Sequence, residues 1–145
     1  MAMSEESGSA KTAIKMIQEA GARATAARLT VLRILLSADH ALTHSDVEQA
    51  ASAAGDLIER VTLYRVLEWL VDQGVAHKTL GLDRVWRFNA HHEAISNHAH
   101  FNCTDCGRVY CMESLNPVFA ITLPPHFQLQ QADVSLQGLC PCCTD

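Results

Sequence analysis

Apolar residues recur at helical spacing in four segments of the first 73 residues. Most of these segments have a recognisable boundary, such as a capping threonine before them or a glycine after them. We therefore predict four helices: residues 11–20, a second helix capped by Thr25, a third between Thr43 and Gly55, and residues 60–73. The expected apolar face of the fourth helix comprises Val61, Tyr64, Leu67, Leu70 and Val71.

Beyond Gly74 the pattern changes from helical spacing to short extended runs. Residues 75–79 and 85–88 flank a turn at 81–83, which is typical of a hairpin. Helices followed by a two-stranded hairpin indicate a winged helix. We expect this N-terminal, DNA-binding type of domain to span residues 1–89.

Residues 90–97 are expected to form a linker to a second domain at 98–145. The elements predicted for that domain are strands near 98–102, 108–111 and 127–136 and a short helix over 114–121. Pro124 and Pro125 cannot continue this helix. The expected fold class is therefore α+β, with a winged-helix domain followed by a smaller α/β domain.

The distribution of charge separates the two halves. The chain carries 11 Lys and Arg against 16 Asp and Glu, and its net charge of −5 argues against indiscriminate coating of nucleic acid. All basic residues except Arg108 precede residue 91, which indicates two halves with different roles. The N-terminal residues lack a secretory signal pattern, and no apolar run approaches the ~20 residues of a membrane span, so we expect a cytoplasmic protein.

Two Cys-x-x-Cys pairs lie in the last third of the chain, Cys103 with Cys106 and Cys140 with Cys143. Each pair can present two thiolates from one tight turn, and two such turns complete the tetrahedral four-sulfur shell of structural zinc. A closed shell leaves no position for a substrate, so the ion would be architectural. The alternatives are cysteines packed as small apolar residues or a redox dithiol. Cys142, inside the second pair, could replace a neighbouring ligand.

Histidines gather around the expected linker. On a strand, His98 and His100 share a face, so both imidazoles can reach one ion. Further candidate donors for the same ion are His77, His91, His92, Glu93 and Cys111. Imidazole and thiolate ligands together favour zinc over magnesium, calcium or manganese. The alternative is a solvated histidine-rich loop without an ion. Three other histidines receive no role, namely His40, His44 and His126.

The fourth predicted helix begins with side chains that can contact DNA, namely Arg60, Thr62, Tyr64 and Arg65. Major-groove readers use the first residues of such a helix. An arginine can bind guanine O6 and N7 as a bidentate pair, and a tyrosine ring can pack on thymine methyl groups. The alternative is an amphipathic surface helix that does not contact DNA.

Taken together, these motifs resemble the ferric uptake regulator family, and most closely its zinc uptake regulator branch. The resemblance covers residues 10–145. Its carriers are Arg23-x-Thr25-x-x-Arg28, Thr62-Leu63-Tyr64-Arg65-Val66-Leu67, His98-x-His100-Phe101-x-Cys103-x-x-Cys106-Gly107 and Gly138-Leu139-Cys140-x-x-Cys143.

The resemblance implies a homodimer with a C-terminal dimerisation domain in each chain, which binds double-stranded, AT-rich operator DNA when loaded with metal. It places Arg23 and Arg28 with the DNA-contacting residues. It matches the four paired cysteines to structural zinc ligands and His98 and His100 to a sensory site. By the same resemblance, His77 stands at a sensory position on the wing.

Two departures from the family pattern sharpen this expectation. Cys111 stands where relatives place a carboxylate ligand, which tilts the sensory preference toward zinc. Ala99 replaces a carboxylate of members with a third metal site, so we expect two ions per subunit. The linker ligand stays open among His91, His92 and Glu93.

The expected function is zinc-dependent repression of metal uptake genes, without enzymatic activity. One alternative is an iron- or peroxide-responsive regulator of the same family. Another, of a different class, is a small zinc hydrolase. The sequence contains no His-Glu-x-x-His motif and no obvious general base beside the ligands, which argues against a hydrolase.

Overall fold

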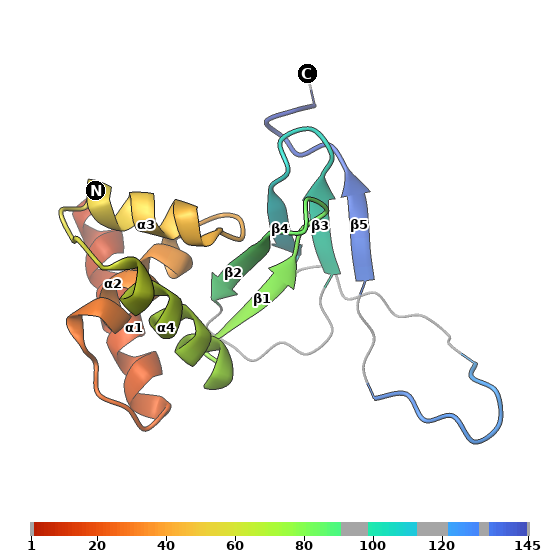
Figure 1. The fold of residues 1–145 in the computed structure, drawn as a ribbon, viewed down its shortest axis with the longest axis horizontal. Helices are drawn as coiled ribbons and strands as arrows, with labels where there is room; N and C mark the ends of the chain where they lie inside the picture. Colours follow the sequence, from red (N-terminus) through yellow and green to blue (C-terminus); the bar gives the residue numbers. More distant parts are fainter. Residues whose placement is uncertain (1, 91–98, 113–121, 131–133, 145) are drawn as a thin grey trace.

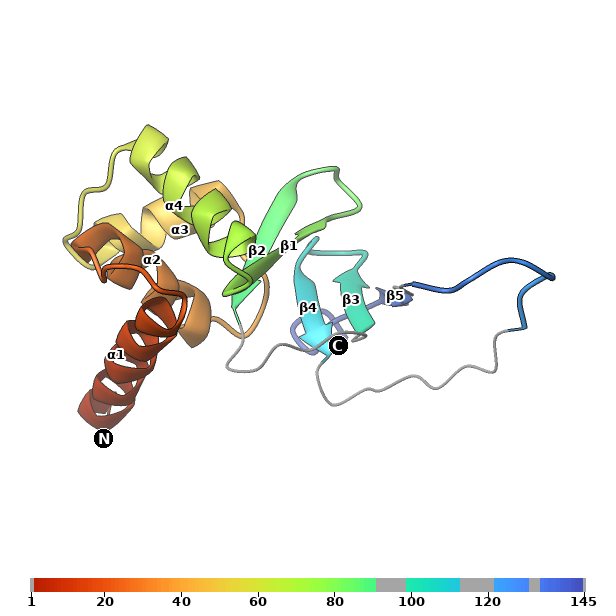
Figure 2. The ribbon, with the colours of Figure 1, turned by 90° about the horizontal axis from the view of Figure 1, so that it is seen from below.

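The computed structural model describes residues 2–90, 99–112, 122–130 and 134–144 of the 145-residue chain. In this part of the chain, four helices gather at one end, and a three-stranded sheet lies at the other. A two-stranded hairpin lies between them (Figure 1). The perpendicular view in Figure 2 shows the same order. These two connected units form the α+β architecture that the sequence predicted.

The helices agree with the sequence predictions except at the start of the first. They are α1 (Ala2–Glu19), α2 (Ala26–Ser37), α3 (His44–Ala53) and α4 (Arg60–Asp72). Helix α1 begins at Ala2, whereas apolar periodicity predicted a start at Lys11. The earlier residues are mostly polar and show no apolar stripe, but they include no proline that would stop a helix.

Two threonines cap their helices, Thr25 as predicted and Thr43 at the predicted boundary of the third helix. The Thr25 side chain accepts a hydrogen bond from the backbone N–H of Arg28 at 3.3 Å at the start of α2. Thr43 forms a full capping box at the start of α3, because its side chain accepts from the Asp46 N–H and its own N–H donates to the Asp46 carboxylate. These bonds satisfy backbone groups that the first helical turns would otherwise leave unpaired.

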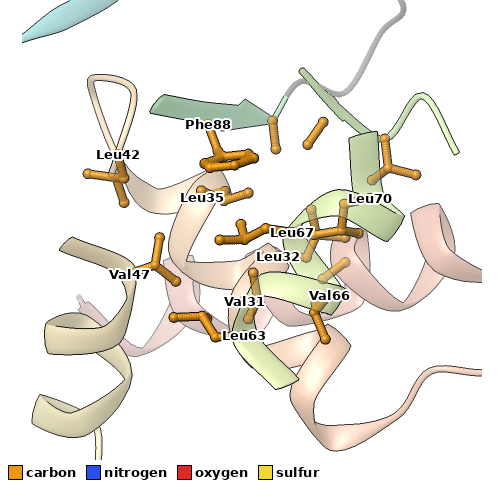
Figure 3. Packing of buried hydrophobic residues seen from close by; sticks show 14 of the residues in the cluster. Val31, Leu32, Leu35, Leu42, Val47, Leu63, Val66, Leu67, Leu70 and Phe88 are labelled. Atoms are coloured by element: carbon orange, nitrogen blue, oxygen red, sulfur yellow. The ribbon is translucent and has the colours of Figure 1, made fainter. Parts of the chain in front are cut away.

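The core of the N-terminal unit lies between α2, α3, α4 and the hairpin (Figure 3), and Ala13 and Ile17 of α1 also belong to it. Its largest fully buried side chains include Leu32, Leu35, Leu63, Leu67 and Phe88. The apolar face of α4 is rotated from the predicted one. Val61 is 60% exposed and Tyr64 44% exposed, while Leu63 and Val66 take the buried positions.

The hairpin consists of β1 (Ala76–Leu80) and β2 (Trp86–Ala90), paired in antiparallel register. Below, we call it the wing. Strand β2 includes Ala90, the first residue of the expected 90–97 linker, and residues 91–97 lie outside the described part of the chain.

Two residues between α2 and α3 connect the wing to the C-terminal sheet. Leu42 pairs with Phe88 of the wing through two backbone hydrogen bonds, of 2.9 and 2.7 Å. The neighbouring Ala41 N–H donates to the Val109 carbonyl at 2.7 Å. The winged helix and the C-terminal sheet are therefore in direct backbone contact.

The C-terminal sheet has the order β4-β3-β5, with β3 (Ala99–Cys103), β4 (Val109–Met112) and β5 (Val134–Gly138). Strand β3 is antiparallel to β4 and parallel to β5. The last strand was predicted over 127–136, but residues 122–130 are not strand, and β5 begins at Val134. The helix predicted over 114–121 lies outside the described residues. None of the helices described is both long and apolar enough to cross a membrane.

Candidate metal centres and nucleic-acid interface

Four sulfur atoms converge at one end of the C-terminal sheet. The ligand atoms of Cys103, Cys106, Cys140 and Cys143 all lie within 4.8 Å of one another. The parallel pairing of β3 with β5 brings them together, because it aligns Cys103 with Gly138 and so places the two Cys-x-x-Cys turns side by side. The Thr104 N–H donates to the Gly138 carbonyl at 2.8 Å and fixes this alignment.

Both turns have the backbone form that two-thiolate ligation needs. In the first, Gly107 adopts φ 78°, a left-handed conformation that favours glycine, and its N–H donates to the Cys103 carbonyl at 3.1 Å. In the second, the Cys143 N–H donates to the Cys140 carbonyl at 2.9 Å. Each turn therefore directs a pair of sulfurs toward the same point.

The spacing of these sulfurs fits a zinc ion. With Zn–S bonds of about 2.3 Å, tetrahedral geometry requires sulfurs roughly 3.8 Å apart. The Cys106 and Cys140 sulfurs are 3.7 Å apart. Cys142 is exposed and lies outside this group, with its sulfur 4.0 Å from Nη1 of Arg108.

The surroundings of the cluster favour the thiolate at two of the four cysteines, Cys103 and Cys140, and the thiol at Cys106 and Cys143. Hydrogen bonds from the backbone N–H groups of Cys106 and Cys140 lower the pKa of the Cys103 thiol to about 6. A hydrogen bond from the Tyr110 hydroxyl lowers the pKa of the Cys140 thiol. Burial acts in the opposite direction at Cys143, whose pKa it raises. A bound cation would remove these differences by deprotonating each coordinating thiol.

A buried arginine of the wing lies beside the first cysteine turn. The guanidinium of Arg87 forms a bidentate pair with the Asp83 carboxylate, at 2.7 and 2.9 Å, and Arg87 is only 8% exposed. This pair lowers the pKa of Asp83 to about 2. A Cβ atom added at Gly107 would lie 3.8 Å from Arg87 Nη2. The guanidinium of this neutral ion pair therefore lies beside the first cysteine turn.

A second group of donors joins the wing to the C-terminal sheet. His77 of β1, His100 of β3 and Cys111 of β4 have ligand atoms within 4.8 Å of one another. His100 and Cys111 are directly paired across the antiparallel strands. His77 Nε2 lies 4.0 Å from Cys111 Sγ, and the two imidazole ring centroids are 5.7 Å apart. Thr79, two residues beyond His77 on the wing, places its Oγ1 3.3 Å from His100 Nε2.

This second group holds three of the sensory ligands named from the sequence. His92 and His98, the other two, lie outside the described residues. Two imidazoles and one thiolate at these distances can form most of a tetrahedral zinc shell. Position 99 carries a buried alanine on β3 and offers no ligand. The described residues therefore form two candidate metal groups.

The first turns of α4 present polar side chains to solvent. Arg60, Thr62, Tyr64 and Arg65 are all exposed, while Leu63, Val66 and Leu67 anchor the opposite face in the core. Arg60 also approaches Glu48, with 3.5 Å between Nε and Oε2 on the surface. This arrangement leaves an accessible helix N-terminus of the kind that enters a major groove.

Arg23, which precedes α2, and Arg28, in the first turn of α2, differ in their contacts. Arg23 is exposed. The Arg28 guanidinium lies 3.8 Å from the centroid of the Trp69 ring and donates to the Arg23 carbonyl at 3.0 Å. Arg28 therefore connects the start of α2 to α4 through a cation–π contact.

Sequence reasoning missed the contacts of two histidines. His44, the first residue of α3, stacks on Tyr64 with 3.8 Å between ring centroids. His40 lies against Tyr110 of the C-terminal sheet, at 5.9 Å between centroids. No sequence signal identifies either contact, because both partners are distant in the chain.

Comparison with known proteins supports one family. The model of the ferric uptake regulator family matches residues 19–116. The zinc uptake regulation protein of Escherichia coli strain K12 is 26% identical over 134 residues, covering 90% of this chain and 78% of that protein. The ferric uptake regulation protein of the same strain is 31% identical over 96 residues, covering 64% of this chain and 62% of that protein.

A solved structure of a zinc uptake regulator complexed with zinc and DNA shares the fold, with a TM-score of 0.65 and 22% identity over 94% of this chain and 93% of that one. The family model alone covers more than half of the chain. Two candidate metal groups and an exposed helix N-terminus agree with this match. The chain belongs to the ferric uptake regulator family and is a metal-binding, DNA-binding, metal-responsive transcription regulator.

Proposed function

We propose that this protein is a zinc-responsive repressor that binds operator DNA as a homodimer and controls genes for metal uptake. The observation that carries the proposal is the convergence of His77 from the wing with His100 and Cys111 from the C-terminal sheet. Because these ligands come from two structural units, an ion bound by all three would fix the position of one unit relative to the other.

Zinc is favoured over iron by the chemistry of the donors. Cys111 supplies a thiolate, and soft thiolate ligands combined with imidazole suit zinc better than oxygen-preferring ions. The likeness to the Escherichia coli zinc uptake regulation protein, which spans 90% of this chain, supports the same choice. The ferric uptake regulation proteins are also similar, so iron is the second candidate.

The proposed mechanism assigns separate tasks to the two metal groups. The four cysteines would hold a structural zinc ion that stabilises the C-terminal sheet. His77, His100 and Cys111 would hold the regulatory ion, with His92 or His98 completing the shell. A bound ion supplies the attraction that keeps these donors together. The wing and the sheet then hold α4 at a fixed distance from its copy in the second subunit, as two half-sites on one face of DNA require.

DNA recognition is assigned to the exposed start of α4. Arg60 and Arg65 would bind phosphates or guanine edges, Thr62 would bind phosphate, and Tyr64 would pack on thymine methyl groups. Arg23 is exposed and available for phosphate, and we assign Arg28 to the same surface. Linkage then requires that DNA raises the affinity for the regulatory ion as much as that ion raises the affinity for DNA, typically by ~1–3 kcal/mol.

A direct test uses protein stripped of its labile ion only. The zinc-loaded protein first selects a duplex from a random-sequence pool, and the affinity for this duplex is then measured with zinc, with ferrous ion and with no added metal. We expect binding to be strong with zinc and at least tenfold weaker without metal. Equal affinity in all three conditions would contradict the proposal, and stronger binding with ferrous ion would favour the iron-responsive alternative.

A further inference from the structure

His44 occupies an unusual place at the junction of three elements of the winged helix. It is the first residue of α3, directly after the capping residue Thr43, so its backbone is fixed by the capping box. Its ring stacks on Tyr64 of α4 with an interplanar angle of 29° and meets Phe88 of the wing edge-on, at 4.8 Å between centroids and 75°.

One nitrogen of this imidazole has no visible structural role. His44 Nε2 is buried and has no hydrogen-bond partner among the residues that the structure describes. The charged groups whose fields reach the ring are Glu68 of α4 and Lys78 of β1, which lie 3.3 Å apart in an ion pair of their own. Buried polar atoms are usually satisfied, and the exceptions call for a specific explanation.

His44 is not explained by metal binding. It belongs to neither group of donors that the described residues form. Its contacts are instead aromatic, and one of them covers a face of the Tyr64 ring. Because Tyr64 keeps 44% of its surface exposed, the rest of that ring stays accessible beside Arg65 at the start of α4.

We propose that His44 is a positioning residue, which holds the Tyr64 ring in place for DNA contact and connects it to Phe88 of the wing. The inference rests on the proposed function, in which the start of α4 reads DNA. Stacking restricts the rotation of the tyrosine ring about its side-chain torsions, so that less freedom is lost when DNA binds. Phe88 is fully buried and backbone-paired to Leu42, which makes it a fixed support for the imidazole.

The contact also places Tyr64 in a connected path to the regulatory donors. Phe88 lies on β2 next to Asn89, which pairs with His77 across the wing. If a metal ion holds the wing in place, the wing fixes Phe88. Phe88 packs on His44, and His44 in turn packs on Tyr64. The orientation of Tyr64 at the start of α4 then depends on the wing through side-chain packing, in addition to the position of the whole domain.

The test compares His44→Ala, His44→Phe and the control Gln49→Ala, an exposed residue of the same helix, in the full-length zinc-loaded protein. Affinity is measured for the selected duplex and for a scrambled duplex of equal length and composition. We expect His44→Ala to weaken binding to the selected duplex about three- to tenfold, the size of one aromatic stacking contact. Binding to the scrambled duplex, zinc content and the Gln49→Ala variant should stay unchanged, and His44→Phe should restore affinity to within about twofold.

A double-mutant cycle separates positioning from general stabilisation. If His44 acts through Tyr64, His44→Ala has no further effect on DNA affinity once Tyr64→Leu is present. Equal losses from His44→Ala in both backgrounds, or equal losses on both duplexes, would overturn the proposal. The proposal would also be overturned if the single variant His44→Ala bound DNA like the wild type while the single variant Tyr64→Leu bound it more weakly. That result would leave the proposed function standing. Failure of the wild-type protein to select any duplex would instead reject the proposed function.

Discussion

The Nε2 atom of His77 lies 4.0 Å from the Sγ atom of Cys111, although the two residues are 34 positions apart and belong to different structural units. His77 lies on the wing and Cys111 on the C-terminal sheet. With His100 beside it, this contact forms the candidate site for the proposed regulatory ion, which would join the two units. The following predictions test this site and the structure around it.

Replacing Cys111 should weaken the regulatory site selectively. Cys111→Ser removes a soft ligand, and we expect the affinity for zinc at this site to fall at least tenfold because thiolate is a much stronger zinc ligand than a hydroxyl. Titration against a competing chelator measures the change, and loading with cobalt(II) reports the thiolate directly through its charge-transfer absorption. The matched control is Cys142→Ser, an exposed cysteine outside both donor groups. Unchanged zinc affinity and cobalt absorption would exclude Cys111 as a ligand.

Loss of the four-cysteine site should unfold the C-terminal sheet. Structural zinc in small motifs binds with an apparent ~10–16 kcal/mol, which is comparable to the stability of a whole small domain. We expect Cys103→Ser to lower the zinc content by one ion per subunit and to abolish hydrogen-exchange protection in β3 and β5. The helices α2 and α4 should remain protected, because their core lies in the winged helix. Full protection of the sheet in the variant would show that zinc is dispensable there.

Truncation in the core of α4 should cost far more stability than truncation on its exposed face. Leu67 is fully buried, and Leu67→Ala is expected to lower the free energy of unfolding by about 2–5 kcal/mol through lost burial and a residual cavity. Val61, which is 60% exposed on the same helix, is the control, and Val61→Ala should stay within about 0.5 kcal/mol. Urea unfolding of zinc-loaded protein measures both. Similar losses at the two positions would contradict the observed rotation of α4.

Arginine at the start of α4 should govern the salt dependence of DNA binding. If Arg65 contacts a phosphate, Arg65→Ala should weaken binding to all duplexes by a similar factor and reduce the slope of log affinity against log salt by about one per subunit. If it contacts a base, discrimination at one position of the duplex should relax instead. Arg33→Ala, an exposed arginine on α2, serves as the control. If Arg65→Ala shows neither of these effects, Arg65 does not contact the DNA.

The partly buried imidazole of His44 should make stability depend on pH. Burial lowers the pKa of His44 below its usual value of 6.5, so the unfolded chain takes up this proton more readily than the folded one. The contribution of neutral His44 is therefore complete above about pH 6.5 and is lost as pH falls through the lowered pKa. Zinc ligands also titrate in acid, so the measured quantity is the difference in unfolding free energy between wild type and His44→Phe. We expect this difference to shift in favour of the variant as pH falls, and a constant difference would contradict the assignment.

Local signals in the sequence predicted most helix boundaries and the wing well, because the causes of these elements are local. Thr43 was predicted as the boundary of the third helix, and in the structure it forms a capping box with Asp46, three residues later. The paired spacing of Cys103 and Cys106 likewise predicted a metal-binding turn. The start of α1 was missed, since its first residues have no apolar stripe to reveal a helix.

Contacts between distant segments could not be predicted in the same way. Helical periodicity placed Tyr64 on the apolar face of α4, yet packing against α2 rotates the helix so that Leu63 and Val66 are buried instead. Nothing in the sequence around His44 indicates that its ring would lie under Tyr64. Such contacts depend on how whole elements pack, which no local pattern records.

The sequence by itself determined the kinds of ligand, the capped helices and the family resemblance, since these depend on residue type and short-range spacing. Only the tertiary structure decided that the wing reaches the C-terminal sheet and that His77 meets His100 and Cys111 there. It also decided which side of α4 faces solvent. The physical reason is that backbone hydrogen bonding and capping act over a few residues, whereas burial of apolar surface and the register of strands join residues of any separation.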